Sequence, residues 1–419
     1  MESYIADWLN LLFRWIHLIA GAAWIGTSFY FNWLNHNLRP PAEEGGAGGA
    51  EGERAGERAG AQGGVSGELF AIHGGHFYRV SKYAGAPARL PETLHWFKWE
   101  AYLTWLTGLC LLLVVYYWNA KLYLIDPSVR AWEPWQAVAA ALASLAGGWV
   151  IYDALCRSPL TRSPRLLAAL VMALVTGAAW GFSHLFGARA AYIHVGAMIG
   201  TIMAANVFFV IIPNQRKMVD AMLAGEPPNT ALGDAGALRS LHNNYLTLPV
   251  LFIMVSNHFP MTYGGAGAWL TLVAISAIGA GARHYFNLKH KGHHAPWILP
   301  AAALALVALA FVLRPAPRPA AAGATSSAPA APTYAAVEEI LKARCVTCHA
   351  AAPTFPGFAA PPQGISYESP AQVKAVAAKI KAVAVEAQIM PPGNLTQITP
   401  EERATLGAWI EAGAPIPGE

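Results

Sequence analysis

The residues with the clearest chemistry lie near the carboxyl end of the chain, in the run RCVTCHA. Cys345 and Cys348 are three residues apart, and His349 follows directly. Two thiols at this spacing can each add to a vinyl group of haem, and the adjacent histidine then reaches the iron. The alternative is a redox-active thiol pair. We predict one covalent haem c, attached at Cys345 and Cys348 and ligated by His349.

A second metal ligand is offered further along the same segment. Met390 lies in the Pro-bounded turn QIMPPGN, where its thioether can bind the other side of the iron. An ordinary core methionine is the alternative. Helical patterns flank these motifs, and the last one begins at Thr399, a residue type that caps helices. This order is typical of a small class I cytochrome c, which predicts His349 and Met390 as the iron ligands.

Most of the remaining chain has the composition of a membrane protein. Hydrophobic residues make up 55% of the sequence and charged residues only 12%. The apolar residues gather into runs of about 20, the length that crosses roughly 30 Å of hydrocarbon. Nucleic acid is an unlikely class of partner because the net charge is only +4. We predict eight spans, at about 9–31, 96–118, 135–155, 164–182, 190–212, 243–259, 267–288 and 296–313.

The distribution of basic residues predicts the orientation in a bacterial inner membrane. Alternate loops, beginning with 39–98, carry most of the Lys and Arg, whereas the loops between them hold only Lys121, Arg130 and Arg189. The positive-inside rule makes the first set cytoplasmic and leaves both termini in the periplasm, where a c-type haem belongs.

Composition also sets the domain boundaries. Within the first cytoplasmic loop, 43–67 contains the near-repeat GERAGERAG and has nothing to bury, so we expect an insertion without stable structure. A Pro/Ala-rich linker occupies 315–333. The predicted fold is therefore all-α: a polytopic transmembrane helical bundle of about eight spans at 1–314, the linker, and a periplasmic cytochrome c domain at 334–419.

Ionisable groups inside the predicted spans are candidates for function because they are costly in lipid. His17 lies about half-way along the first span, beside small residues, and His194 and His242 lie in or next to later spans. Pairs such as His17 with His194 or His242 suggest a non-covalent haem b, since imidazole suits iron. Binding of substrate or movement of protons is the competing interpretation.

Four separated blocks of the membrane half carry a family likeness. They are RWIHLIAGAAWIGTSFYFNWLN, HGGHFYRVSKYAGAPARLPETLHWFKWEAYLTWLTG, AAYIHVGAMIGTIMAANVFFVIIPNQRKMV and NNYLTLPVLFIMVSNHFP. Together with the CxxCH segment they resemble the bacterial membrane-bound urate oxidases, or urate hydroxylases, with a C-terminal cytochrome c domain. The insertion at 43–67 departs from this pattern, as does His76.

The resemblance implies oxidation of urate to 5-hydroxyisourate, with water as the oxygen source and the electrons leaving through the covalent haem. Such a reaction needs a cation near the anionic purine and a base that activates water. The candidate cations are Arg79, Lys82, Arg89, Lys98 and Arg14, and topology is the favoured explanation for most of those that lie in loops. The candidate bases are His73, His76, His95 and Glu100. Arg14 and Glu100 are also candidates to pair with each other.

Partners and rival functions follow from the same residues. The expected partners are the lipid bilayer, urate, and a periplasmic cytochrome or terminal oxidase that accepts electrons. The main rival is a non-catalytic module that passes electrons from quinol or a partner protein to the cytochrome. A transporter with a regulatory cytochrome is a third possibility. The oligomeric state is left open by the sequence.

Overall fold

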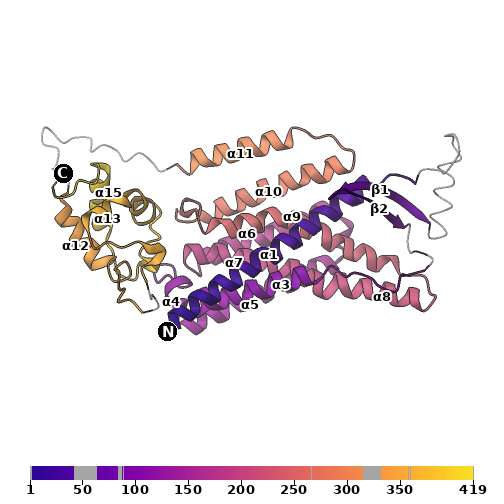
Figure 1. The fold of residues 1–419 in the computed structure, drawn as a ribbon, viewed down its shortest axis with the longest axis horizontal. Coiled ribbons are helices and arrows are strands. Elements are labelled where there is room, and N and C mark those ends of the chain that lie inside the picture. The colour runs from indigo at the N-terminus through magenta and orange to yellow at the C-terminus, as the bar shows by residue number, and fades with distance from the viewer. Residues whose placement is uncertain are drawn as a thin grey trace.

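The computed structural model describes residues 2–41, 64–83, 87, 89–265, 267–314, 332–356, 358 and 360–418. Most of these residues are helical, in a long N-terminal bundle and a small C-terminal domain (Figure 1). The linker at 315–333 lies almost wholly outside the described residues. So does most of the predicted insertion, of which only the last residues are described, where they begin a strand.

Each of the eight predicted spans coincides with helical structure. Helix α3 continues without a break into η1, and α7 continues through η3 into α8. The bounds are α1 Glu2–Asn37, α3 Trp99–Leu111, η1 Leu112–Tyr117, α5 Pro134–Arg157, α6 Pro164–Ser183, α7 Ala188–Ala205, η3 Asn206–Ile211, α8 Ile212–Leu223, α9 Thr230–Ser256, α10 Ala268–His290 and α11 Ile298–Val312.

Five of the described helical stretches are long and apolar enough to cross a membrane: those of α1, α3, α5, α6 and α7. The other three predicted spans differ for two reasons. Helices α9 and α10 carry buried polar side chains, Arg239 and Arg283 among them. Helix α11 has only 15 residues, or about 22 Å of length. The count of eight spans therefore stays a prediction.

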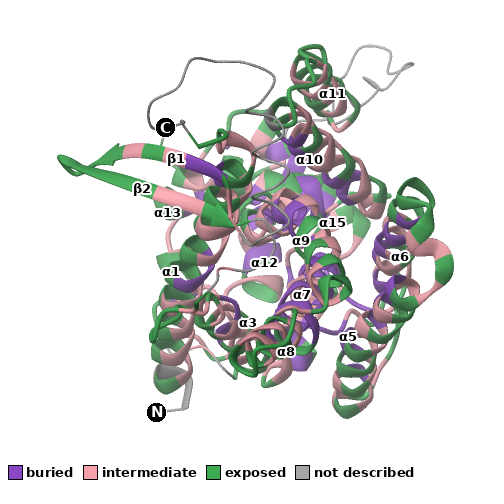
Figure 2. Ribbon diagram, turned by 90° about the vertical axis from the view of Figure 1, so that its right-hand side faces the viewer, coloured by how far each residue is buried: buried purple, intermediate pink, exposed green. Residues whose placement is uncertain are grey.

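Helix α7 forms the centre of the bundle. It packs against α3, α5, α6 and α9, and most of its side chains are buried. Figure 2 shows buried residues on α7 and on the neighbouring helices around it. The outer helices instead expose large apolar side chains, such as Trp15 and Leu18 on α1 and Val150 on α5. An apolar outer surface of this kind is compatible with a lipid environment.

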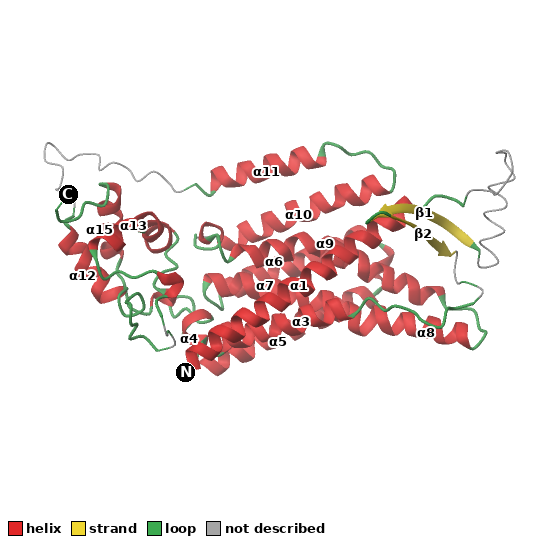
Figure 3. Ribbon diagram, viewed as in Figure 1, coloured by secondary structure: helices red, strands yellow, loops and turns green. Residues whose placement is uncertain are grey.

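The prediction of an all-α fold is wrong at one place. Strands β1 (Val65–His73) and β2 (His76–Tyr83) form an antiparallel hairpin (Figure 3). Gly74 and Gly75 make the two-residue turn with φ of +58° and +81°, values that a hairpin turn needs and glycine adopts without strain. β-Branched and aromatic residues on both sides favour extended backbone.

Among the described residues, hydrogen bonds join the base of the hairpin to the end of α1. The backbones of Glu68 and Arg39 pair, and Lys82 donates a hydrogen bond of 2.6 Å to Asn35 at the end of α1. Towards the turn, Phe77 is 83% exposed.

The C-terminal domain is built on four main helical segments around a small core. Trp409 is fully buried there, against Tyr334 and Leu406. The predicted N-cap at Thr399 is confirmed: its hydroxyl accepts from the Glu402 amide, and the Glu402 carboxylate accepts from the Thr399 amide. The segments are α12 Tyr334–Arg344, α13 Pro370–Ala375, α14 Ala377–Ile380 with η6 Lys381–Glu386, and α15 Pro400–Glu411.

The C-terminal domain rests on the end of the bundle where α1 begins (Figure 1). A short helix of the bundle, α4 (Ala120–Tyr123), packs against the turn Pro392–Asn394. A Cβ placed on Gly393 would lie 3.0 Å from the Ile125 carbonyl, and one on Gly264 would lie 2.5 Å from the Ala387 Cβ. The two domains therefore approach each other backbone to backbone.

Candidate functional site

One cavity in the C-terminal domain brings together all four residues predicted to hold the covalent haem. Cys345, Cys348 and His349 follow α12, and Met390 comes from the loop before α15. The cavity encloses about 610 Å³, part of which is open to solvent, and most of its exposed lining is apolar. A mostly apolar lining with a few polar groups is typical of a cofactor site.

The orientation of His349 suits an axial ligand. Its Nδ1–H donates to the Ile365 carbonyl at 2.9 Å, so Nε2 carries the lone pair. Metal-bound histidines usually donate their other ring N–H to a carbonyl or carboxylate in this way. Burial lowers the pKa of His349, which favours the neutral imidazole that iron needs.

Two arginines hold the loop that carries Met390. Arg403, itself buried, donates to the Met390 carbonyl at 2.8 Å and also to the Ala384 carbonyl. Arg344 donates to the Thr396 carbonyl at 2.7 Å and pairs with Glu402. The backbone around the thioether is thereby fixed to α12 and α15. These contacts, the apolar cavity and the free Nε2 of His349 together fit a covalently attached haem.

The cavity is completed by a residue of the other domain. Leu122, on α4, is one of its lining residues. One wall of the cavity is therefore turned towards the N-terminal bundle, and part of the bundle covers it.

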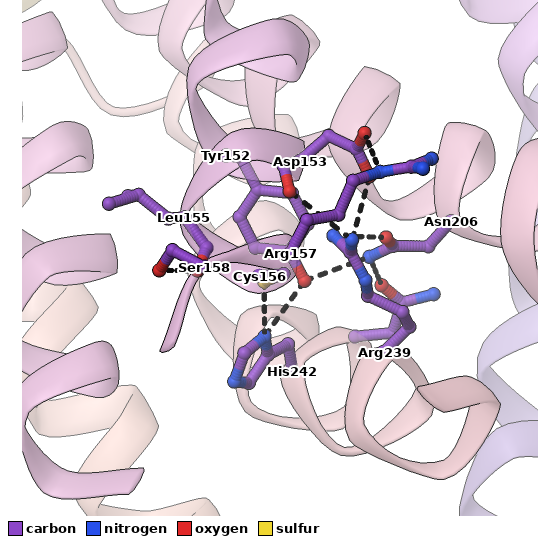
Figure 4. A network of polar contacts seen from close by, with 10 residues as sticks. Tyr152, Asp153, Leu155, Cys156, Arg157, Ser158, Asn206, Arg239 and His242 are labelled. Carbon is purple, nitrogen blue, oxygen red and sulfur yellow. Dashed lines mark hydrogen bonds and ion pairs between the residues drawn. The ribbon is translucent and has the colours of Figure 1, made fainter. Parts of the chain in front are cut away.

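A buried polar network ties three helices of the bundle together (Figure 4). Arg239 on α9 donates to the Asp153 carboxylate on α5 at 2.7 Å, and only 4% of its side chain is exposed. Asn206, where α7 passes into η3, donates to Tyr152 at 3.1 Å and to Asn243 at 2.8 Å. The network thus fixes α5, α7 and α9 to one another.

His242 lies at the edge of this network. Its Nδ1 is 2.8 Å from the Tyr152 hydroxyl and 3.7 Å from the Cys156 sulfur. A histidine hydrogen-bonded to a tyrosine can hold or pass a proton. The sequence pointed to His242 as a candidate ligand, but it did not single out Arg239 or Asp153 as its neighbours. The available signal in the sequence was the position of Arg239, just before the apolar run at 243–259.

The other two histidines predicted to hold a haem b have different surroundings. His17 donates from Nδ1 to the Thr104 carbonyl at 2.8 Å, and no partner of its Nε2 is found among the described residues. His194 is fully buried and uses both ring nitrogens, with the Ala190 carbonyl and the Tyr117 hydroxyl. Ligation of iron by His194 would require Tyr117 to move away.

His17, His194 and His242 have no contact residue in common. The hydrogen-bond partners of His17 lie on α3, those of His194 on η1 and α7, and those of His242 on α5. The described part of the chain holds no group of three metal-binding side chains. The haem b stays a prediction.

The five residues named for catalysis do not form one site. His73 and His76 pair across the turn of the hairpin and are exposed. His95 packs edge-on against Phe97, with ring centroids 4.4 Å apart. Glu100 lies in the first turn of α3, whereas Arg14 lies near the start of α1 and donates to Asn10 at 2.9 Å. No ion pair between Arg14 and Glu100 occurs among the described contacts.

Comparison with known proteins gives one match. The profile of a protein family described as "Urate oxidase N-terminal" matches residues 3–314. Neither the curated proteins nor the solved structures contain a significant match. The matched region ends where the linker begins, so it covers the whole N-terminal bundle and leaves out the C-terminal domain.

Proposed function

The chain belongs to the urate oxidase N-terminal family, and we propose that it is a membrane-bound oxidoreductase. In this proposal it oxidises urate to 5-hydroxyisourate and passes the electrons to a haem c attached to the C-terminal domain. The observation that carries the proposal is the conjunction of the family match with a cavity lined by Cys345, Cys348, His349 and Met390.

The chemistry balances without molecular oxygen. Uric acid and one water give 5-hydroxyisourate, two protons and two electrons; the new bond joins the water oxygen to C5 of the purine. The protons need acceptors, and the electrons need a carrier. A bound haem c supplies that carrier, accepting one electron at a time.

The chain's own residues make the carrier's site. Cys345 and Cys348 would attach the group and His349 and Met390 would ligate its iron, while Arg403 holds the Met390 loop in place. Leu122 of the bundle shields one wall of the cavity from water. A thioether ligand and an apolar surrounding both raise the reduction potential of a haem, which favours acceptance of electrons.

The proposed orientation in the membrane follows from the distribution of basic residues and from the position of the C-terminal domain on the bundle. Both the start of α1 and the C-terminal domain lie at one end of the bundle (Figure 1). The positive-inside rule assigns that end to the periplasm of a bacterial inner membrane. A periplasmic cytochrome or a terminal oxidase is the acceptor we propose for the next step.

The test is anaerobic turnover of the full-length protein in water enriched in ¹⁸O, with an oxidised soluble c-type cytochrome as the final acceptor. We expect 5-hydroxyisourate that carries one ¹⁸O, two equivalents of reduced cytochrome for each urate, and no peroxide. His349→Ala, which removes the proposed ligand, should abolish this turnover.

Two results would contradict the proposal. A requirement for oxygen, with peroxide formed, would show that the haem does not take the electrons. Absence of any urate-dependent product, with a haem that quinol reduces, would favour the non-catalytic electron-transfer module instead.

A further inference from the structure

A second buried polar cluster joins α10 to α9 and α1. Arg283 on α10 donates from Nε to the Asn244 Oδ1 at 2.8 Å, and Asn287 donates to the same oxygen at 3.2 Å. Asn32 of α1 donates to Asn287 at 3.0 Å. All of these links are between uncharged amides and one guanidinium, so the cluster carries a net positive charge.

The arginine of this cluster has no counter-ion in the described structure. Arg283 is 6% exposed, and its guanidinium lies 3.9 Å from the centroid of the Phe29 ring. No carboxylate pairs with it among the described residues, whereas the other buried arginine of the bundle, Arg239, is paired with Asp153. A buried charge is normally paired because removing it from water is costly.

An unused hydrogen-bond donor belongs to the same cluster. Asn244 is 4% exposed, and its Nδ2 has no hydrogen-bond partner. Exchanging the positions of the amide oxygen and nitrogen would not give Nδ2 a partner, because the oxygen accepts hydrogen bonds from both Arg283 and Asn287. A buried donor left without a partner is costly, because its lost hydrogen bond to water is not replaced. The structure therefore holds an unpaired cation and an orphan donor on two side chains in direct contact.

We propose that Arg283 and Asn244 form the binding site for the anionic substrate, the urate anion; this inference rests on the proposed function. A planar purine anion presents carbonyl oxygens and ring nitrogens as neighbouring acceptors. A guanidinium matches such a pair with two parallel N–H groups, and a carboxamide adds one further donor. Only Nε of Arg283 is used within the cluster, which leaves its terminal N–H groups for the ligand.

The position of the site determines the side from which urate enters. Arg283 lies seven residues before the end of α10 at His290, and Asn32 lies five residues before the end of α1. These ends lie away from the C-terminal domain, on the side of the hairpin (Figure 1). The substrate site and the haem cavity are thus at opposite ends of the bundle.

A hydrogen-bonded pair flanks the site. The Tyr245 hydroxyl lies 2.7 Å from Nδ1 of His284. Each of these residues follows directly after one of the two ligand-binding residues, Asn244 and Arg283, so the same two helical turns carry both pairs.

The test compares urate binding by the full-length protein and three variants, measured by equilibrium dialysis with labelled urate. Asn244→Asp places a carboxylate of the same shape beside Arg283 and so supplies its missing counter-ion. We expect it to weaken urate binding at least tenfold while the melting temperature stays the same or rises. Arg283→Gln should weaken binding by a similar factor, roughly what loss of one charged hydrogen bond costs.

Lys289→Gln is the matched control, since Lys289 is an exposed cation on the same helix. It should bind urate as the wild type does. Unchanged binding in both Asn244→Asp and Arg283→Gln would overturn the assignment of this site and leave the proposed function intact. A fall in the melting temperature of Asn244→Asp would also contradict it, because Arg283 would then already have had a partner. A wild-type protein that binds no urate would overturn both proposals.

Discussion

The Asp153 carboxylate forms ion pairs with two arginines that differ in exposure. This difference determines how much stability is lost when each ion pair is removed. Arg239 is 4% exposed in its side chain, whereas Arg157, one helical turn from Asp153, is 68% exposed. An exposed pair contributes little because water and salt screen it. A buried cation left without its partner is far more costly.

We therefore expect Asp153→Asn to lower the free energy of unfolding by about 3 kcal/mol, because Arg239 stays buried without a carboxylate. Arg157→Gln should cost less than about 1 kcal/mol. Reversible unfolding of the detergent-solubilised protein measures both. Equal costs for the two variants would show that the buried pair has no special weight.

The prediction that Met390 is the second axial ligand can be tested through the reduction potential of the haem. Met390→His should keep the haem attached, since Cys345 and Cys348 are unchanged, and should lower its reduction potential by on the order of 0.1 V, within the roughly 0.8 V range that axial ligands cover. Potentiometric titration followed by absorbance measures this. Met222→Leu, on α8, is the control. A potential that does not move in Met390→His would exclude the thioether as a ligand.

Single residues show how far the sequence could predict a site. The spacing of Cys345, Cys348 and His349 carries its own chemistry, so local pattern was sufficient to place them in one cavity with Met390. Arg239 and Arg283 have no such local pattern. Their roles depend on side chains of other helices, Asp153 and Asn244, and no spacing in the sequence encodes that meeting.

At the scale of elements, the close packing of α7 depends on glycine at one position and not at the next turn. A Cβ on Gly196 would lie 2.6 Å from Cγ2 of Ile253 on α9, a stiff β-branched side chain. A Cβ on Gly200 meets nothing within 4 Å. Both glycines belong to the same helix and differ only in what faces them.

Gly196→Ala should consequently lower the free energy of unfolding by about 1–3 kcal/mol, the usual cost of overpacking. Gly200→Ala should have little effect or stabilise slightly, because alanine is the better helix former. Thermal unfolding of the two variants side by side measures the difference. The packing argument fails if Gly200→Ala proves the more damaging.

In the C-terminal domain, the contact between α12 and α15 predicts a dependence on pH. Burial alone would raise the pKa of Glu402, but hydrogen bonds from Arg344 and from the Thr399 amide outweigh it, and the pKa lies below the ordinary 4.5. A carboxylate with a lowered folded-state pKa stabilises fully above its ordinary pKa, and the effect is lost as pH falls through the lower value.

Glu402→Gln should therefore reduce stability at neutral pH and flatten the loss of stability as the pH falls below the ordinary carboxyl pKa of 4.5. Acid titration of the full chain, followed by haem absorbance, measures this. Glu338→Gln, which removes the exposed pair with Lys342, should keep the wild-type profile. Identical acid profiles for Glu402→Gln and the wild type would refute the assignment.

Elements also show where prediction from sequence stops. Periodic apolar runs placed helices at every predicted span, because hydrophobicity alone selects helices in such runs. The hairpin at Val65–Tyr83 was missed since aromatic and histidine residues in a loop gave no clear period, and its Gly-Gly turn was not taken as a hairpin signal. Length and composition mark five helices as candidate spans. Helices α9 and α10 are not among these five because they carry buried polar side chains.

At the scale of the whole molecule, the proposed transfer of electrons between the domains would depend on their close approach. Gly264 of the bundle faces Ala387 of the C-terminal domain, and a Cβ there would lie 2.6 Å from the Ala387 carbonyl oxygen. The neighbouring Gly265 has nothing within 4 Å. These adjacent glycines form a matched pair for testing the contact.

Gly264→Val should move the domains apart. Urate-dependent reduction of the haem should then slow several-fold, because the rate of electron transfer falls with distance. Reduction by dithionite, which reaches the cavity from solvent, should not change. Gly265→Val should behave as the wild type in both assays. Equal rates in the two variants would mean that this contact is not on the electron path.

The domain order was predictable because composition changes sharply at the linker, whereas the docking of the two domains was not. Leu122 lies on the short helix α4 and Gly264 in a loop, neither segment carries a motif, and only the folded chain brings them to the C-terminal domain. The proposed coupling between an oxidation in the bundle and a haem outside it would therefore be a property of the folded two-domain molecule.

The most direct test of this coupling is the optical spectrum of the purified full-length protein, oxidised and free of oxygen, before and after urate is added. We predict that reduced c-type bands appear, with two haems reduced for each urate consumed. A haem that dithionite reduces but urate leaves oxidised would contradict the proposed function.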